Sequence, residues 1–443
     1  MTRLNSKAYI VSFLYKFFPD FLIDPILHSY TQWKSTVNIK RKKRKQKQAI
    51  GKLNSKRPIR CVFLALYDSI WKCDSLYQKM EVDERFEPII LVCPIVNKGR
   101  EHMLEEMDRQ YQSFKEKGYN VLRSYNSLEN KYIDVKESLS PDILVYTNPY
   151  KGLIDDRYYI DHYEDVLTIY IPYYINGTVN NDMAYNMPVH NYSWRYYVES
   201  ESHLRLAEKY SSAKGRNVVV SGYPGIEEFI DGRVSKVEYK KWKSNSDKRK
   251  RIIWAPHQTI EAVGHVHYSC FMLYYGYMIE IADKYADTIQ IIFKPHPLLK
   301  GNLYKIWGKE KTNKYYYQWE ERENTAIEYG DYHNLFITSD ALIHDCGSFT
   351  TEYLYLNKPV LRTMNGVPLE TMFGSFGLKC IDCHYKAYNE QDIEQFIQNV
   401  INGVDPMKEQ RTKFVKDELM PKGGMPSENI INDIIDSIEH QRV

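Results

Sequence analysis

The chain of 443 residues lacks the glycine-rich signatures of the common nucleotide-binding loops. Neither the G-x-x-x-x-G-K-[ST] pattern of P-loop enzymes nor the G-x-G-x-x-G pattern of dinucleotide-binding folds occurs in it. P-loop phosphoryl transfer and nicotinamide-dependent hydride transfer therefore have no support. An apolar content of 43% and a charged content of 26% are typical of a folded globular protein, which excludes overall disorder.

Cysteine is also scarce. Seven cysteines, an odd number scattered over a long chain, argue against a disulfide scaffold and favour a reducing compartment. Cys380, Cys383 and His384 spell the C-x-x-C-H pattern of haem attachment. We reject that interpretation, because the stretch LKCIDCHY is predicted to be an ordinary strand and nothing supplies a second axial ligand.

No uninterrupted apolar run is long enough to span a bilayer. The stretch YIVSFLYKFFPDFLIDPIL (residues 9–27) comes closest, but charged residues and prolines interrupt the run of about 20 apolar residues that a span needs. A signal peptide is not indicated either, since the positive charges follow the apolar part and no small-residue cleavage site appears. We therefore expect a cytoplasmic protein.

Positive charge is concentrated in the segment IKRKKRKQKQ (residues 39–48), which carries seven lysines and arginines, whereas the whole chain has a net charge of +3. With the preceding apolar stretch it predicts an amphipathic, polybasic N-terminal arm over residues 1–50. Such an arm would bind an anionic membrane surface and hold the protein at the inner face of the cell membrane. One alternative is a helical hairpin packed on the body with a solvated charge run. Nucleic acid is the least favoured partner, and we expect none.

Tyrosine is unusually frequent, with 39 residues. General residue usage is the simpler explanation, and aromatic side chains that stack on sugars are the alternative.

From residue 58 onwards, apolar strands alternate with amphipathic helices, which predicts parallel sheets covered by helices on both faces. A polar, charged stretch near residues 231–250 divides the pattern. We therefore predict an α/β protein of two doubly wound, Rossmann-like domains facing across a cleft. The expected boundaries are 51–232 for an acceptor domain, 233–425 for a nucleotide-donor domain and 426–443 for a C-terminal helix.

Polar side chains stand at successive strand ends of the second half. His257 follows RIIWAP, Lys294 and His296 lie in IIFKPHP, and His344 and Asp345 follow ALI. Ligands of doubly wound sheets bind at the carboxyl ends of the strands, so we expect these residues to converge on one cleft. The lysine and the absence of clustered acidic ligands favour an anion site over a metal site.

A strand-to-helix turn follows, in SDALIHDCGSFTTEYLYLNKPVL (residues 339–361). Gly347 would let a ligand approach the backbone, Ser348 and Thr351 would donate hydroxyl hydrogen bonds to phosphate, and Glu352 would accept from ribose hydroxyls. The first turn of a helix suits an anion because its N–H groups are unpaired. An ordinary capped helix, with Ser348 as the cap and Thr351 in the core, explains the same residues without a ligand.

These motifs resemble the CDP-glycerol glycerophosphotransferase family, whose members are teichoic-acid and capsule polymer enzymes of GT-B fold. IIWAPHQT resembles the family's APTW strand end, IIFKPHP its RPHP or KPHP, and residues 339–361 its SDxLIxDYSSxxxDYLxLxKPV; VVVSGYPGIEEF resembles its GxPRxD. The resemblance covers roughly residues 165–365. It implies that His296 is catalytic, that Asp345, Ser348 and Glu352 face the CDP moiety, and that Gly222 and Pro224 form the interdomain turn.

One departure concerns the acceptor side. The family usually carries a His-Gly-Thr triplet with a presumed histidine base, whereas this chain has Asn176, Gly177 and Thr178. Asparagine cannot act as a general base at neutral pH. His190 and His257 are the candidates to replace it.

The resemblance implies transfer of glycerol phosphate, or a related polyol phosphate, from a CDP-linked donor to a lipid-linked or polysaccharide hydroxyl, with release of CMP. The expected setting is teichoic acid or capsule synthesis, with no metal and no cofactor beyond the nucleotide donor. One alternative is a GT-B glycosyltransferase that uses a nucleotide-sugar for surface polysaccharide. A second alternative is an inactive GT-B module in a membrane assembly complex.

Overall fold

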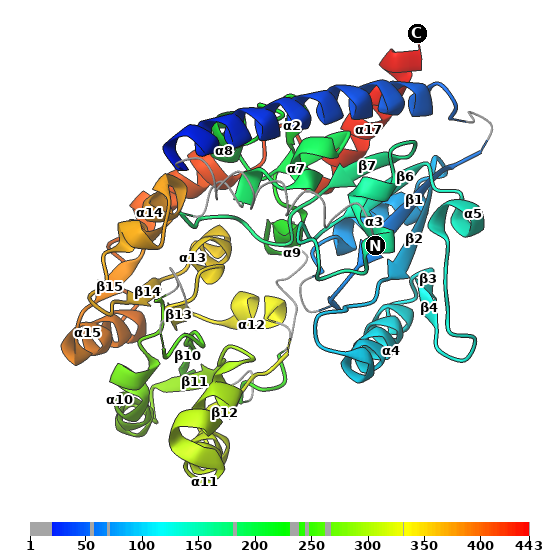
Figure 1. Ribbon diagram of the computed structural model, residues 1–443. Coiled ribbons are helices and arrows are strands. Elements are labelled where there is room, and N and C mark those ends of the chain that lie inside the picture. The colour runs from blue at the N-terminus through cyan, green and yellow to red at the C-terminus, as the bar shows by residue number, and fades with distance from the viewer. Residues whose placement is uncertain are drawn as a thin grey trace.

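The computed structural model describes residues 20–53, 57–68, 71–179, 184–230, 239–243, 248–261, 267–330 and 332–442. These residues form two α/β lobes, each built on a parallel sheet (Figure 1). The predicted fold class is confirmed. Residues 9–19 of the predicted membrane-binding stretch lie outside the described residues.

The N-terminal lobe has a seven-stranded sheet in the order β3-β2-β1-β6-β7-β8-β9, with all neighbours parallel. Its strands are β1 (Ile59–Ala65), β2 (Phe86–Val92), β3 (Val121–Arg123), β6 (Ile143–Tyr146), β7 (Leu167–Tyr170), β8 (Arg195–Val198) and β9 (Val218–Val220). Its helices are α3 (Asp74–Val82), α4 (Arg100–Glu116), α5 (Val135–Leu139), α7 (Pro188–Tyr192) and α8 (Glu201–Tyr210), and a small hairpin pairs β4 (Tyr125–Asn126) with β5 (Lys131–Tyr132).

The C-terminal lobe has a six-stranded parallel sheet in the order β12-β11-β10-β13-β14-β15. Its strands are β10 (Lys250–Ala255), β11 (Ile289–Phe293), β12 (Thr325–Ile327), β13 (Ala341–His344), β14 (Val360–Thr363) and β15 (Tyr385–Ala387). The helices are α10 (Phe271–Lys284), α11 (Leu299–Glu321), α12 (His333–Thr338), α13 (Phe349–Glu352), α14 (Ser375–Ile381), α15 (Glu390–Ile401) and α16 (Lys408–Phe414).

The strands are almost continuously apolar because helices cover both faces of each sheet. All residues of β6, β7, β11 and β13 are buried. In both sheets the chain order reverses next to the first strand of the lobe, between β1 and β6 and between β10 and β13. Ligands of doubly wound sheets bind outside the carboxyl ends of the strands at such reversals.

The chain crosses between the lobes at two places. One crossing runs through η4 (Pro224–Ile226) and α9 (Glu227–Ile230), and the other leads from η8 (Val415–Leu419) into α17 (Pro426–Arg442). They touch at Gly222, whose φ is 85°, and a Cβ there would lie 2.7 Å from Cβ of Pro421 and 2.9 Å from Cγ of Pro426. Both the backbone angle and the lack of space require glycine at this position.

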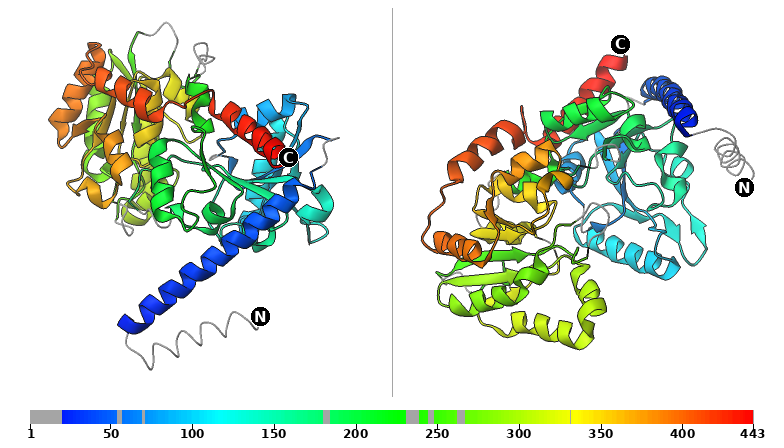
Figure 2. Two further views of the ribbon diagram at one scale, coloured as in Figure 1. Left: turned by 90° about the horizontal axis from the view of Figure 1, so that it is seen from above. Right: turned by 60° about the vertical axis from the view of Figure 1, so that its left-hand side comes forward.

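Helix α17, which the sequence left as a separate C-terminal unit, packs on the N-terminal lobe (Figures 1 and 2). Its isoleucines at 430, 431, 434 and 438 are buried in one cluster with residues of β1 and α3. The core of the N-terminal lobe is therefore completed by the end of the chain.

The polybasic segment belongs to a single long helix, α2 (Asp20–Ile50), whose C-terminal part packs on the N-terminal lobe (Figure 2). Ile39 and Ile50 are buried, Lys42 Nζ donates a hydrogen bond to the carbonyl of Ile160 at 3.0 Å, and Gln46 Nε2 donates to the carbonyl of Tyr192 at 2.7 Å. Burial lowers the pKa of Lys42. The basic segment is thus docked along one side rather than being a free arm.

The other side of that segment is exposed and basic. Lys40, Arg41, Lys43, Arg44 and Lys47 are exposed, and Arg41 pairs with Glu164. No helix in the described part of the chain has an apolar stretch long enough to cross a membrane.

The stretch LKCIDCHY is not the predicted strand. Its first half lies in the short helix α14, and its cysteines are buried in the C-terminal lobe. The strand prediction is wrong because seven residues hold too few helical turns for the period to be recognised.

Candidate functional site

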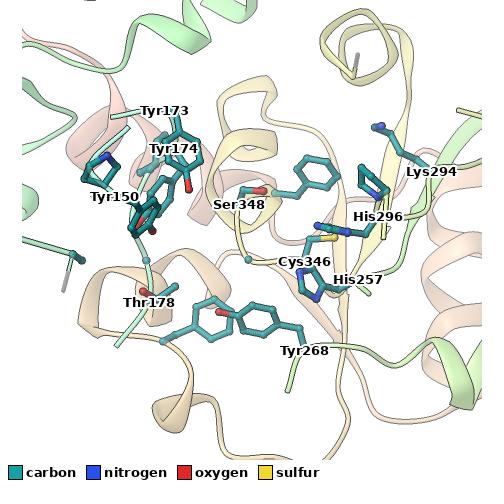
Figure 3. Close-up of a pocket in the computed structure, with 18 of the residues that line it drawn as sticks. Tyr150, Tyr173, Tyr174, Thr178, His257, Tyr268, Lys294, His296, Cys346 and Ser348 are labelled. Atoms are coloured by element: carbon teal, nitrogen blue, oxygen red, sulfur yellow. The ribbon is translucent and has the colours of Figure 1, made fainter. Parts of the chain in front are cut away.

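A pocket of about 440 Å³ lies between the two lobes, which is within the range of small-molecule sites. Its walls come from the segments that follow the carboxyl ends of β6 and β7 in one lobe and of β10, β11 and β13 in the other. Figure 3 shows tyrosines on one side and Lys294 with two histidines on the other. The lining residues are Pro149, Tyr150, Tyr170, Tyr173, Tyr174, Ile175, Gly177, Thr178, Ala184, Met187, His257, Tyr268, Lys294, Pro295, His296, Pro297, Cys346, Gly347, Ser348, Phe349 and Phe373.

His257 and His296, both predicted from strand ends, meet in this pocket with ring centroids 4.8 Å apart. The Nδ1 of His296 accepts a hydrogen bond from the N–H of Leu298 at 3.2 Å, which puts the proton of the neutral ring on Nε2. Thr259 Oγ1 accepts from the N–H groups of Tyr268 and Ser269, so its own proton is directed to His257 Nδ1, 3.0 Å away. Both imidazoles are therefore N–H donors at Nε2.

The surroundings keep both rings neutral. Burial lowers the pKa of His257 to about 3, with further contributions from His296 and Arg362, and burial together with Lys294 lowers the pKa of His296 to about 4. At neutral pH each ring can donate a hydrogen bond to an anionic oxygen without the cost of a buried positive charge. Neither ring has a basic Nε2 in this tautomer.

Lys294 supplies the positive charge of this wall. Its side chain is 7% exposed, and Nζ donates to the carbonyl of Gly330 at 2.8 Å. Gly347 and Ser348 continue the wall, and a Cβ at Gly347 would come within 3.3 Å of the Tyr268 ring. The helix that follows, α13, has only four residues and continues as the 3-10 turn η6 (Tyr353–Leu356).

Three predicted donor-binding residues do not line the pocket. The carboxylate of Asp345 accepts from the backbone N–H groups of His257 at 2.5 Å and Cys270 at 2.6 Å, so it braces the loop that carries His257. Burial raises its pKa to about 6. Thr351 Oγ1 donates to Cys380 Sγ at 3.5 Å, and the carboxylate of Glu352 accepts from the hydroxyl of Tyr332. All three side chains are buried.

The triplet Asn176-Gly177-Thr178 joins the lobes. Asn176 Oδ1 accepts from the N–H and the hydroxyl of Thr178, both at 3.0 Å, which closes a tight turn. The carbonyl of Gly177 accepts from Gly374 N at 2.9 Å in the C-terminal lobe. Gly177 and Thr178 line the pocket, and the imidazole of His203 donates to the Asn176 carbonyl at 3.1 Å.

Two other histidines fall outside the pocket. His190 is packed edge-on against the rings of Tyr170 and Tyr196, and its Nδ1 accepts from Met187 N at 3.0 Å. Burial lowers its pKa to about 3. His344 is buried beside His384, with 3.3 Å between their nitrogens. The structure therefore does not bring the candidate base His190, or the third strand-end histidine, to the site.

The sequence interpretation missed the tyrosine side of the pocket and a buried arginine behind it. Tyr150 follows β6, and Tyr173 and Tyr174 follow β7, so the strand-end argument applied to the first half would have found them. Arg362 is 1% exposed and donates to the carbonyl of Cys346 at 3.0 Å and that of Asp345 at 3.2 Å. Its charge thus lies directly behind the Cys346–Ser348 wall.

The described part of the chain contains no cluster of side chains that would bind a metal ion. Among those residues, no group of three or more histidine, cysteine, aspartate or glutamate side chains is placed to hold an ion. The expectation of a metal-independent reaction stays a prediction.

Residues 176–366 match the family model of the CDP-Glycerol:Poly(glycerophosphate) glycerophosphotransferases. No curated protein matches the chain. Among solved structures, a histidine-to-alanine variant of the wall teichoic acid polymerase TagF is 15% identical, with a TM-score of 0.56, over 93% of this chain and 98% of that one. A histidine-to-asparagine variant of TagF soaked with CDPG is 14% identical over the same shares, with a TM-score of 0.56.

The UDP-GlcNAc 2-epimerase from Neisseria meningitidis, bound to UDP-GlcNAc, is 14% identical with a TM-score of 0.52, over 86% of this chain and all of that one (100%). At these identities the structural neighbours establish the GT-B-like fold. The family match confirms the resemblance seen in the motifs.

Proposed function

We propose that this protein transfers glycerol phosphate, or a related polyol phosphate, from a CDP-linked donor to an acceptor hydroxyl in the synthesis of wall teichoic acid or capsule. The main support for the proposal is that the segment matched by the family model contains residues of both pocket walls. Residues 176–366 include Gly177 and Thr178 on one wall and His257, Lys294, His296, Gly347 and Ser348 on the other.

The C-terminal wall has the donors that a diphosphate needs. Lys294 brings a positive charge, and His257 and His296 offer Nε2–H groups from rings that stay neutral. Arg362 adds a positive potential from behind the wall without reaching the pocket. Preorganised donors in a partly dry site stabilise charge that develops on a leaving phosphate more strongly than water does. A ribose contact by Glu352 is not part of the proposal, because its carboxylate is used by Tyr332.

In the reaction, the acceptor oxygen forms a bond to the glycerol-bearing phosphorus, and the bond from that phosphorus to the bridging oxygen breaks. CMP leaves with the bonding electron pair, and the hydroxyl proton passes to solvent. Phosphoryl transfer has a loose transition state, so the nucleophile needs to be positioned more than it needs to be deprotonated early. This explains how a chain with Asn176 in place of the family histidine can work without a base at that position.

Peripheral membrane binding is part of the proposal, because a lipid-linked acceptor stays at the membrane. The exposed side of α2 would meet anionic lipid, at about 1 kcal/mol for each lysine or arginine near the surface. Replacing Lys40, Lys43, Arg44 and Lys47 by glutamine should weaken binding to phosphatidylserine vesicles by about 10²- to 10³-fold. The matched control replaces the exposed Lys309, Lys408, Lys413 and Lys416 of the other lobe, and equal losses in both variants would contradict the assignment of this surface.

The test of the transferase itself is donor binding followed by CMP release. A ligand at a hundredfold excess over its dissociation constant stabilises the folded state by about 2.7 kcal/mol, which a thermal-shift screen detects. We expect a shift with CDP-glycerol or CDP-ribitol, lost in His296→Ala and kept in His162→Ala, a surface histidine of the other lobe. A shift with UDP-sugars alone would make the protein a glycosyltransferase, and no shift with any nucleotide would favour an inactive module.

A further inference from the structure

The two walls of the pocket differ in chemistry. The C-terminal wall carries Lys294, the two imidazole donors and, behind them, Arg362. The N-terminal wall contains no lysine or arginine among its described lining residues and consists of tyrosine, aliphatic and small side chains. One wall is therefore suited to a phosphate and the other to an uncharged group.

Three tyrosines dominate the N-terminal wall. Tyr173 and Tyr174 are adjacent in the chain, and their ring centroids are 4.8 Å apart with the planes inclined by 51°. The side chain of Tyr150 lies near both and contributes to raising the pKa of each. The three side chains lie together on one side of the pocket, as Figure 3 shows.

The three side chains are held by the protein but not fully covered by it. Each is only partly buried, and the backbone carbonyl of Tyr173 is fixed by a 2.7 Å hydrogen bond from the hydroxyl of Tyr223. Burial raises the pKa of Tyr173 and Tyr174, so both phenols are neutral and can donate and accept hydrogen bonds. Fixed rings with neutral hydroxyls match a sugar, which offers C–H groups on its faces and hydroxyls on its edge.

We propose that Tyr150, Tyr173 and Tyr174 form the acceptor subsite, and that the acceptor enters it as a neutral saccharide whose hydroxyl is directed at the donor phosphate. This inference rests on the proposed function and adds the chemical class of the acceptor. The competing acceptor is the glycerol-phosphate end of a growing polymer. Its own phosphate would sit close behind the attacking hydroxyl, against a wall whose described lining residues include no lysine or arginine, and an unpaired buried charge is costly there.

The experiment compares a neutral acceptor with one that ends in a glycerol phosphate. One is octyl β-N-acetylglucosaminide, and the other is the same glycoside carrying one glycerol phosphate. The full chain and CDP-glycerol are used with each, and the product is identified by mass spectrometry, with donor binding followed in parallel by thermal shift. We expect transfer to the neutral glycoside and a slower reaction, or none, with the anionic one.

Substitutions distinguish an effect on acceptor binding from an effect on donor binding. Tyr173→Leu removes the ring, and we expect it to raise the KM for the neutral glycoside by about 3- to 10-fold, the size of a lost aromatic contact, with the KM for CDP-glycerol unchanged. Tyr173→Phe keeps the ring and should keep most of the affinity. Tyr388→Leu, a surface tyrosine that is 63% exposed, is the control and should change neither constant.

The outcomes distinguish this inference from the proposed function. If CDP-glycerol neither binds nor releases CMP, the proposed function fails. If the donor binds but only the anionic acceptor is used, or neither acceptor is used, the neutral-acceptor inference is overturned alone. An equal rise of both KM values in Tyr173→Leu would likewise refute the subsite, because it would mean that the whole pocket is disturbed.

Discussion

Gly377 offers a direct test of the contact between the lobes. It lies in α14, and a Cβ built on it would be 2.2 Å from the carbonyl oxygen of Gly177 and 3.0 Å from a ring carbon of Phe373. Non-bonded carbon contacts are optimal near about 3.5 Å, so Gly377→Ala must push the Gly177 turn away from α14. Gly177 and Phe373 both line the pocket, and the displacement therefore also reaches the site.

The magnitude follows from a comparison with a second helical glycine. A Cβ at Gly276, in α10, meets nothing within 4 Å, so Gly276→Ala should gain the usual helix propensity of about 1 kcal/mol. The same gain applies to Gly377→Ala and cancels between the two variants. What remains is the overpacking cost of about 1–3 kcal/mol, and this is the expected difference in the free energy of unfolding.

The assay is urea unfolding of both variants, with the rate of CMP release measured alongside. We expect Gly377→Ala to be less stable than Gly276→Ala by that amount and to transfer more slowly, with Gly276→Ala close to the parent protein in rate. If the two variants were equally stable and equally active, the two lobes would not meet at Gly177 and Gly377 in solution, and the pocket described above would lose one of its walls.

Three further outcomes are expected. His296→Ala should lower transfer by about 10²-fold, the effect of removing one preorganised donor, with an unfolding free energy close to that of the parent; near-normal turnover would exclude the donor role. The His190→Gln variant should be more stable than the parent protein at acidic pH. The pKa of His190 is about 3 in the folded state and about 6.5 in the unfolded chain, so the unfolded state takes up a proton as the pH falls below 6.5. At pH 5 the parent should therefore have lost about 2 kcal/mol of unfolding free energy that the variant keeps. Parallel pH profiles of unfolding would contradict the burial of His190. Asp345→Asn places an amide N–H₂ against one of the two backbone N–H groups that the carboxylate binds, those of His257 and Cys270. It should lower the free energy of unfolding by about 1–3 kcal/mol. The variant Asp340→Asn, at the start of β13, is the matched control for this measurement.

The sheet architecture could be predicted because buried parallel strands are continuous apolar runs, and such runs need no tertiary information to be recognised. The same holds for the positions of His257, Lys294 and His296, since the carboxyl ends of parallel strands share one edge of a sheet. The direction of a side chain beyond a strand end does not follow from that rule. Asp345 and Glu352 are in the predicted place in the chain, but they turn inwards to brace backbone and Tyr332.

The packing of α2 on the N-terminal lobe could not be predicted from the sequence because of the helix's composition. Its buried positions, 39, 42, 46 and 50, have helical spacing, but lysine and glutamine occupy two of them. Long polar side chains can bury their stems while their ends find carbonyl groups, as Lys42 and Gln46 do, so a search for apolar residues alone misses the stripe. The tyrosine side of the pocket was missed for another reason: tyrosine is frequent throughout the chain, so the individual tyrosines at strand ends did not stand out.

The return of α17 to the N-terminal lobe means that this lobe is discontinuous in sequence. A fragment that stopped at residue 230 would expose the surface that the four isoleucines of α17 cover, and it would be prone to aggregate for that reason alone. The segment matched by the family model begins inside one lobe and ends inside the other, so what it describes is a shared cleft and not an autonomous folding unit. Exchange of modules between such enzymes would have to carry the last helix together with the first half of the chain.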